Sequence, residues 1–313
     1  MYLECYNKAM KKIIITGGSG FLGAQIAQKL LDTGGYEIVV LDIVPPRIQD
    51  DQVSYFEKNL MESFDESAEY ELLKNPFAVI HLSGRNIFGR FTGQHKQAIY
   101  DTRVIGSRNL VKLFNRPEYR PQSLVAASAV GYYGDQPGQI LVESSNRENY
   151  DFLSDVVESW EEENLHAQEL GVNVTCIRNG HIIGAGGILA QTAKTFKYGI
   201  GFILGSGREY FPWVDARDLV NLYIKCAEAD QAPAIVNGVS ATSSTHGDFA
   251  RAIGAHKKTK MYMHVPEWLL KLKFGSFGSE MLVDQHVQSE VYQDILFIPK
   301  HSTLSAIIKK YLS

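Results

Sequence analysis

Residues 16–23 read Thr-Gly-Gly-Ser-Gly-Phe-Leu-Gly and directly follow the apolar run at 13–15. This pattern predicts a buried strand, a glycine-rich turn and a helix. Gly17 permits the tight turn, Gly20 lets the main chain approach a pyrophosphate, and Gly23 lets the helix pack closely on the strand. The first turn of such a helix presents free N–H groups and a positive dipole end to phosphate. The stretch therefore predicts dinucleotide binding rather than an ordinary structural turn. The residues expected to line the site are Gly17, Ser19, Gly20, Phe21, Leu22 and Gly23.

An acidic residue follows this turn at the distance where dinucleotide-binding proteins hold the adenosine ribose. Residues 37–41 predict the second strand, which ends in Asp42, nineteen residues after Gly23. A carboxylate at this point accepts hydrogen bonds from a free ribose 2′-hydroxyl and repels a 2′-phosphate. The sequence therefore favours NAD as the cofactor. Arg47 lies five residues further on and could reach a phosphate, so NADP stays open.

The composition argues against several classes of protein. The chain has 313 residues, 45% of them hydrophobic, and a formal net charge of −4. It has no basic run and no apolar run of membrane-span length, so neither nucleic acid nor a membrane is an expected partner. Its cysteines, Cys5, Cys176 and Cys226, stand far apart, which fits reduced thiols in a cytoplasmic protein. The nine histidines form no metal-binding spacing, so no metal site is expected.

Strand-like runs alternate with helical patterns over the first 180 residues. The runs lie at 13–16, 38–41, 53–56, 77–82, 124–127 and 172–178. Such alternation predicts an α/β fold with a Rossmann-type doubly wound parallel sheet, whose carboxyl strand ends form the ligand edge. Residues that follow the third and fourth strands are expected at this edge, in the cofactor site. They are Asn59, Leu60, Leu82, Ser83 and Gly84.

The chain changes character after about residue 180, where glycines punctuate a long irregular stretch. We expect a dinucleotide-binding domain over 10–180 and a small C-terminal α/β substrate lobe over 181–313. The segment at about 210–240 is expected to return to the first domain, with a helix that Asp218 caps and a strand at 234–239. Helical patterns at 266–273 and 304–312 fall in the lobe. Residues 1–9 lack the apolar core of a signal peptide and are expected to be a dispensable extension.

A second motif, Ser-Leu-Val-Ala-Ala-Ser-Ala-Val-Gly-Tyr-Tyr-Gly, occupies residues 123–134. It resembles the strand-then-serine segment of extended short-chain dehydrogenases/reductases, the class that contains nucleotide-sugar epimerases and dehydratases. Further segments are similar to an atypical subgroup labelled NAD-dependent epimerase/dehydratase or epimerase family protein. These segments are 160–161, 178–180, 186–187, 204–208 and 213–215. The resemblance covers residues 11–312. It implies NAD or NADP as cofactor and a small-molecule, nucleotide-linked substrate, and it is compatible with a homodimer.

In the wider class, catalysis depends on a serine, a tyrosine and a lysine four residues after that tyrosine. The tyrosine exchanges a proton, the lysine stabilises the tyrosinate, and the serine holds the substrate oxygen. Ser128 fills the serine position. The helix expected at about 150–161 has no tyrosine–lysine pair. If Glu161 is matched to the acid that closes the family motif, Leu153 and Val157 occupy the two positions.

Three interpretations of the missing pair stay open. Tyr132 or Tyr133 supplies the proton beside Ser128; or an acid such as Glu143 or Glu161 does so; or no turnover occurs. In the last case the chain is a dinucleotide-binding regulator or redox sensor. The leading interpretation is an NAD(P)-binding, epimerase/dehydratase-like oxidoreductase.

Several other residues are candidates for the site. Arg178, at the end of the sixth predicted strand, is assigned to the cofactor site. Arg208, in a Gly-Ser-Gly-Arg turn, is expected to bind the anionic part of the substrate, because a guanidinium matches phosphate or carboxylate. Family matching would let Arg103 brace the site, and His181 is a weaker acid–base candidate. The Tyr-x-x-x-Lys spacing at 70–74 is attributed to chance.

Overall fold

A seven-stranded sheet, parallel throughout, forms the body of the computed structural model, which describes residues 10–148 and 151–313. Its strand order is β11-β7-β5-β4-β1-β2-β3. This order confirms the predicted α/β, Rossmann-type doubly wound fold. The strands are β1 (Lys11–Thr16), β2 (Tyr36–Asp42), β3 (Val53–Glu57), β4 (Ala78–His81), β5 (Ser123–Ala129), β7 (Asn173–Asn179) and β11 (Ile235–Gly238).

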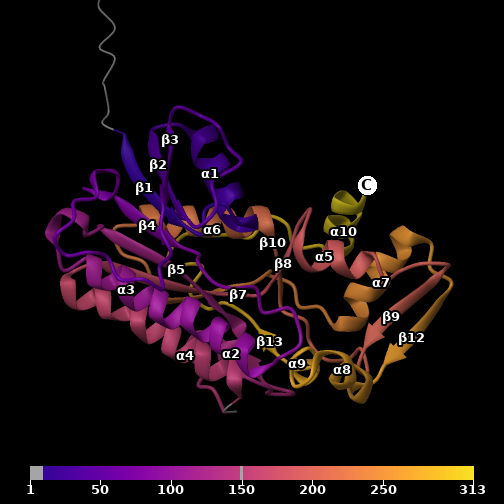
Figure 1. The fold of residues 1–313 in the computed structure, drawn as a ribbon. Helices are drawn as coiled ribbons and strands as arrows, with labels where there is room; N and C mark the ends of the chain where they lie inside the picture. The colour runs from indigo at the N-terminus through magenta and orange to yellow at the C-terminus, as the bar shows by residue number, and fades with distance from the viewer. Residues whose placement is uncertain (1–9, 149–150) are drawn as a thin grey trace, which may run out of the picture.

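Helices cover both faces of this sheet (Figure 1). One face carries α1 (Phe21–Thr33) and α6 (Ala216–Glu228); the other carries α2 (Gly93–Tyr100), α3 (Gly106–Leu113) and α4 (Phe152–Leu165). A sheet covered on both sides requires apolar strands, and all four residues of β4 are buried. Between α2 and α3 the helix widens into a π-turn, η2 (Asp101–Ile105).

Short polar contacts fix where helices begin. Asp215 caps α6 by accepting a hydrogen bond from the N–H of Arg217 (2.8 Å). The prediction that Asp218 caps this helix is therefore wrong. Asp218 lies inside the first turn and accepts hydrogen bonds from His301, from its N–H at 2.7 Å and its Nδ1 at 2.8 Å. The two acids stand one turn apart, and their different partners could not be read from the local sequence.

The later part of the chain builds small paired strands beside the main sheet (Figure 1). Strand β8 (His181–Ile183) pairs with β10 (Trp213–Asp215), and β9 (Ile200–Leu204) pairs with β12 (Met261–Val265). These strands share a hydrophobic cluster with α5 (Gly187–Ala193), α7 (His246–Lys257) and α10 (Leu304–Leu312). A further pair joins β6 (Ile140–Leu141) to β13 (His286–Val287). The predicted extension at 1–9 lies outside the described residues.

Aromatic rings tie the C-terminal segment to the loop that follows β4. This segment contains α8 (Glu267–Phe274) and α9 (Phe277–Glu280). Phe91 stacks on Phe277 with ring centroids 4.7 Å apart, and Phe152 at the start of α4 meets Phe91 edge-on at 5.7 Å. The N–H of Phe91 donates to the carbonyl of Phe274 (3.2 Å). Segments far apart in the chain thus share one aromatic cluster.

The described part of the chain lacks two kinds of feature. None of its helices is long and apolar enough to cross a membrane. Within residues 10–148 and 151–313, no group of three His, Cys, Asp or Glu side chains is placed to hold a metal ion.

Candidate functional site

The glycine turn between β1 and α1 has room for main chain only. Gly17 has a φ of +67°, and its N–H donates to the carbonyl of Leu41 (2.9 Å). A Cβ on Gly17 would lie 2.9 Å from the nitrogen of Ser83, and a Cβ on Gly23 would lie 2.6 Å from the carbonyl oxygen of Gly17. Around Gly20, by contrast, the only atom that an added Cβ would meet within 4 Å, among the described residues, is the Gly17 oxygen at 3.1 Å. The turn therefore has the form that a dinucleotide pyrophosphate fits.

Asp42 is held against this turn at the end of β2. One carboxylate oxygen accepts a hydrogen bond from the N–H of Ser19 (3.0 Å), and the other accepts one from the N–H of Ile43 (2.7 Å). The hydroxyl of Ser19 donates to the carbonyl of Val44 (2.5 Å). The turn and the strand end thus form one rigid corner, with the acid where the sequence predicts contact with the ribose.

The residues that follow β4 lie next to the glycine turn, whereas those that follow β3 are occupied with local structure. Leu82 and Ser83 contact the position of a Cβ on Gly17 at 3.1 Å or less. Asn59 accepts a hydrogen bond from the N–H of Met61 (3.1 Å), which is ordinary turn chemistry. Leu60 is buried in the core, and its carbonyl accepts from the side chain of a buried asparagine on α3. The cofactor role of Asn59 and Leu60 stays a prediction.

Phe21 connects the glycine turn to the start of the later segment. Its ring packs so closely against the turn after β8 that a Cβ on Gly184 would lie 2.6 Å from the ring, and one on Gly186 would lie 3.2 Å from it. The sequence singles out Phe21 and the segment 186–187, but nothing in their spacing indicates that they touch.

A buried ionic network occupies the carboxyl ends of β5 and β7. Glu161 of α4 accepts two hydrogen bonds from Arg178 of β7, each 2.8 Å long, and a third from the hydroxyl of Ser128 of β5 (2.5 Å). Arg178 also donates to the hydroxyl of Tyr133 (3.1 Å). Ser128, Glu161 and Arg178 are each no more than 5% exposed. The network therefore joins two strands and a helix around the serine.

The two neighbouring tyrosines of η4 (Val130–Tyr133) differ in their surroundings. Tyr133 is fully buried, and its hydroxyl lies 2.8 Å from the side-chain oxygen of Asn237 and 3.0 Å from the carbonyl of Val142. Burial raises the pKa of Tyr133 to about 12. Tyr132 is half-buried, and its ring centre lies 3.5 Å from the guanidinium carbon of Arg178. Of the two hydroxyls, that of Tyr132 is the more accessible to a ligand.

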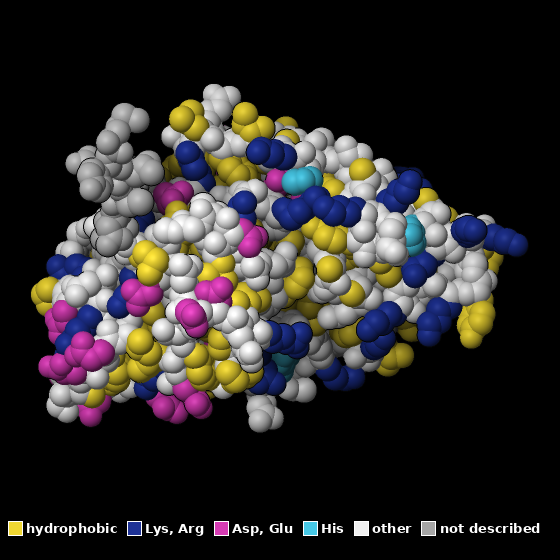
Figure 2. Space-filling model, turned by 90° about the horizontal axis from the view of Figure 1, so that it is seen from above, with side chains coloured by type: hydrophobic (Ala, Val, Ile, Leu, Met, Phe, Trp, Pro, Cys, Tyr) yellow, Lys and Arg dark blue, Asp and Glu magenta, His cyan; other side chains and the backbone are white. Residues whose placement is uncertain are grey.

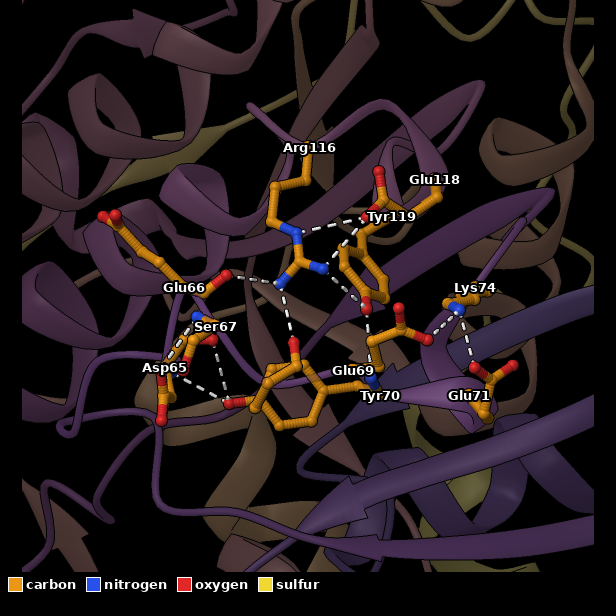
Figure 3. Close-up of polar contacts among 11 residues, drawn as sticks. Asp65, Glu66, Ser67, Glu69, Tyr70, Glu71, Lys74, Arg116, Glu118 and Tyr119 are labelled. Carbon is orange, nitrogen blue, oxygen red and sulfur yellow. Dashed lines mark hydrogen bonds and ion pairs between the residues drawn. The ribbon is translucent and has the colours of Figure 1, made fainter.

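The Tyr-x-x-x-Lys spacing at 70–74 belongs to a separate polar cluster (Figure 3). Lys74 forms ion pairs with Glu69 (2.8 Å) and Glu71 (2.6 Å), and the hydroxyl of Tyr70 accepts a hydrogen bond from the N–H of Asp65 (2.8 Å). Both side chains are thus engaged in local structure before β4.

The remaining candidates take different positions. The Glu143 carboxylate accepts hydrogen bonds from two N–H groups, those of Asn237 (2.8 Å) and Glu290 (2.9 Å), so it anchors the chain after β13 to β11. His181 stacks on Phe211 with ring centroids 4.3 Å apart, and burial lowers its pKa to about 3. Arg208 is exposed in the turn after β9. The structure does not bring Arg208 into the Ser128–Glu161–Arg178 network.

Charge is distributed unevenly along the chain and over its surface. Residues 181–313 contain fourteen Lys and Arg against eleven Asp and Glu, whereas residues 1–180 contain seventeen against twenty-four. Figure 2 shows Lys and Arg side chains gathered over the end of the molecule that the later segment forms. This end attracts anions.

A buried histidine lies beneath the glycine turn, at the end of β4. His81 Nδ1 lies 2.6 Å from the hydroxyl oxygen of Thr16, and Nε2 lies 3.0 Å from that of Ser107. Burial lowers the pKa of His81 to about 4. Its role was not predicted from the sequence, although a histidine inside an otherwise apolar strand is itself a signal.

Acidification is expected to destabilise the fold through His81. The unfolded chain binds this proton below its ordinary pKa of 6.5, but the folded chain binds it only near pH 4. The contribution of neutral His81 to the free energy of unfolding is therefore fully present above about pH 6.5. It is lost as the pH falls, by about 2 kcal/mol between pH 7.5 and 5.0. Urea denaturation at both pH values should show a smaller pH dependence for His81→Gln than for wild type. His166→Gln, at an exposed histidine, is the control and should keep the pH dependence of wild type. A pH dependence in His81→Gln equal to that of wild type would contradict the low pKa assigned to His81.

Comparisons with known proteins agree with this architecture. An epimerase family protein of Staphylococcus haemolyticus is 27% identical over 296 residues, which cover 94% of this chain and 97% of the relative. The crystal structure of human epimerase family protein SDR39U1 with NADPH has a TM-score of 0.82 at 23% identity and covers 96% of this chain and 98% of its own. MoeE5 in complex with UDP-glucuronic acid and NAD has a TM-score of 0.75 at 16% identity, with coverage of 96% and 98%. The model of the NAD dependent epimerase/dehydratase family matches residues 13–237. The chain belongs to this family.

Proposed function

We propose that this protein is an NAD-dependent, epimerase/dehydratase-like oxidoreductase that acts on a small anionic substrate, with a nucleotide-linked sugar as the leading class. The observation that carries the proposal is the glycine turn with Asp42 locked against it, next to a buried network that holds Ser128 at the same sheet edge. Family membership supports the cofactor class.

The cofactor would lie across the carboxyl ends of the strands. Gly17, Gly20 and Gly23 would hold its pyrophosphate at the start of α1, and Asp42 would hold the adenosine ribose. Its nicotinamide supplies hydride transfer. Similar structures with NADPH and with NAD support a nicotinamide dinucleotide, and Asp42 favours NAD.

Substrate groups would be handled by residues on the other side of the crevice. The hydroxyl of Ser128 donates its hydrogen bond to Glu161, so its lone pairs are available to a substrate hydroxyl. Tyr132 is our candidate for proton exchange, with Tyr133 fixing its position. Arg208 and the basic segment 181–313 would attract the anionic part of the substrate. In this proposal 181–313 is mainly the substrate lobe, and the segment at about 210–240 returns to the dinucleotide-binding domain of 10–180. The UDP-sugar ligand of MoeE5 supports the substrate class.

The test has two stages. In the first, NAD, NADH, NADP and NADPH are titrated while Tm and tryptophan fluorescence are followed; no response to any of them would overturn cofactor binding. In the second, protein loaded with NADH or NADPH is mixed with a panel of carbonyl compounds and nucleotide sugars in single turnover. Tight cofactor binding with no turnover of any panel member would favour the regulator or sensor over the enzyme.

Asp42→Arg is expected to change the cofactor preference. The carboxylate repels a 2′-phosphate, whereas a guanidinium binds it with charged hydrogen bonds of about 1.5–3 kcal/mol. The ratio of the NADPH and NADH dissociation constants should therefore shift toward NADPH by about tenfold or more. Asp50→Arg, on the exposed loop before β3, makes the same change of charge as a control. An Asp42→Arg ratio equal to that of the control would contradict the assigned role of Asp42.

A further inference from the structure

Arg103 stands at the sheet edge between the two halves of the candidate site. It belongs to the π-turn η2, a form of helix that is frequent at functional sites. Its guanidinium packs on the loop after β4 so closely that a Cβ on Gly84 would lie 3.3 Å from its central carbon. On its other side it covers the ring of Trp160, with 5.1 Å between the guanidinium carbon and the ring centroid. Trp160 precedes Glu161, the partner of Ser128.

The strand order indicates which half of a bound dinucleotide Arg103 would face. The adenosine end lies toward β2, where Asp42 stands, and the pyrophosphate lies over β1 at the glycine turn. The nicotinamide must therefore extend the other way, over β4 toward β5. Arg103 contacts Gly84 after β4 and lies beside the partner of Ser128 of β5, so it faces the reacting end of the cofactor and not its pyrophosphate.

Arg103 has carbonyl partners but no acidic partner within the described part of the chain. One of its terminal nitrogens donates to the carbonyls of Arg85 (2.9 Å) and Ile99 (3.4 Å), but no Asp or Glu among the described residues forms an ion pair with it. Burial lowers the pKa of Arg103 to about 10, which still leaves it charged at neutral pH. Arg103 as a whole is half-buried. The neighbouring indole N–H of Trp160 is buried without an acceptor in the described part of the chain. A charge without a counter-ion and a buried donor without an acceptor both carry a free-energy cost, which an oxyanion ligand would lower.

We propose that Arg103 binds the carboxylate or phosphate of the substrate next to the reacting carbon. The proposal rests on the proposed function, because it needs the cofactor crevice, and it assigns a second anion-binding arginine besides Arg208. A planar guanidinium donates two parallel hydrogen bonds to either oxyanion, which fixes the orientation of the substrate as well as its charge.

The test uses NAD-loaded protein, with inorganic phosphate and acetate as probes and acetamide as the neutral comparator, at constant ionic strength. Tryptophan fluorescence should show saturable binding of at least one anion to wild type and none of acetamide. Arg103→Met should weaken that binding by about tenfold or more, since a charged hydrogen bond contributes about 1.5–3 kcal/mol. Arg103→Lys keeps the charge and should weaken it less. Arg85→Met, on the exposed neighbouring residue, is the matched control and should leave it unchanged.

The binding results distinguish failure of the proposed function from failure of the inference about Arg103. If wild type does not bind NAD, the proposed function fails before any anion is added. If wild type binds NAD but neither anion, or if Arg103→Met binds the anions as Arg85→Met does, the inference about Arg103 fails alone. If Arg103→Met loses affinity for NAD while its anion binding is unchanged, Arg103 serves the cofactor and the substrate assignment is overturned. Circular dichroism and Tm of Arg103→Lys establish that the fold is kept.

Discussion

Replacing Arg178 with methionine is expected to lower the free energy of unfolding by about 3–5 kcal/mol, the cost of leaving a buried charge without its partner. Arg178 and Glu161 are 3% and 5% exposed, so Glu161 would lose its two hydrogen bonds from Arg178 at a site closed to solvent in the intact fold. Tyr133 would lose one of its hydrogen bonds, and Ser128 would be left on a carboxylate without its counter-ion, because both residues hydrogen-bond to members of this pair. Urea denaturation at pH 7.5 measures the loss.

A surface pair on the same helix provides the control. Arg108 binds Glu163 of α4 at 2.5 Å, but the arginine side chain is 47% exposed. Arg108→Met should therefore cost less than about 1 kcal/mol. Adding Glu161→Gln to Arg178→Met removes the unpaired negative charge of Glu161 and should recover part of the lost free energy of unfolding. Equal losses for the two single arginine variants would contradict the buried network.

Gly23→Ala is expected to weaken NAD binding by about tenfold or more and to lower Tm. The new methyl group would stand 2.6 Å from both the Gly17 oxygen and the Gly18 Cα, which are main-chain atoms that cannot rotate away. Overpacking of this kind costs about 1–3 kcal/mol, and it would displace the turn that holds the pyrophosphate. Calorimetric titration with NAD and a thermal melt give the two readouts.

The matched control is Gly93→Ala, in the first turn of α2, where an added Cβ meets nothing within 4 Å. Alanine is the better helix former, so this variant should bind NAD normally and keep its Tm. If Gly23→Ala behaves as Gly93→Ala does, the close packing of the glycine turn is not what shapes the site.

The parts of the structure that could be predicted are those that local sequence determines. The glycine turn depends on residues within eight positions of one another, and apolar runs such as that of β4 indicate their own burial. The Ser128–Glu161–Arg178 network could not be predicted, because it needs β5, α4 and β7 in place before any of its hydrogen bonds exist. The same holds for Tyr132 and Tyr133. Their order in the chain does not show which ring enters the core, since that depends on Asn237 of β11.

The stacking of Phe91 on Phe277 makes the loop after β4 and the C-terminal segment a single mechanical unit. To separate them, the rings must part and the main-chain hydrogen bond between Phe91 and Phe274 must break. A displacement of this loop at Phe91 would therefore carry α8 and α9 along with it. A substitution in α8 or α9 would then change the rate at which a ligand enters and leaves the site beside this loop.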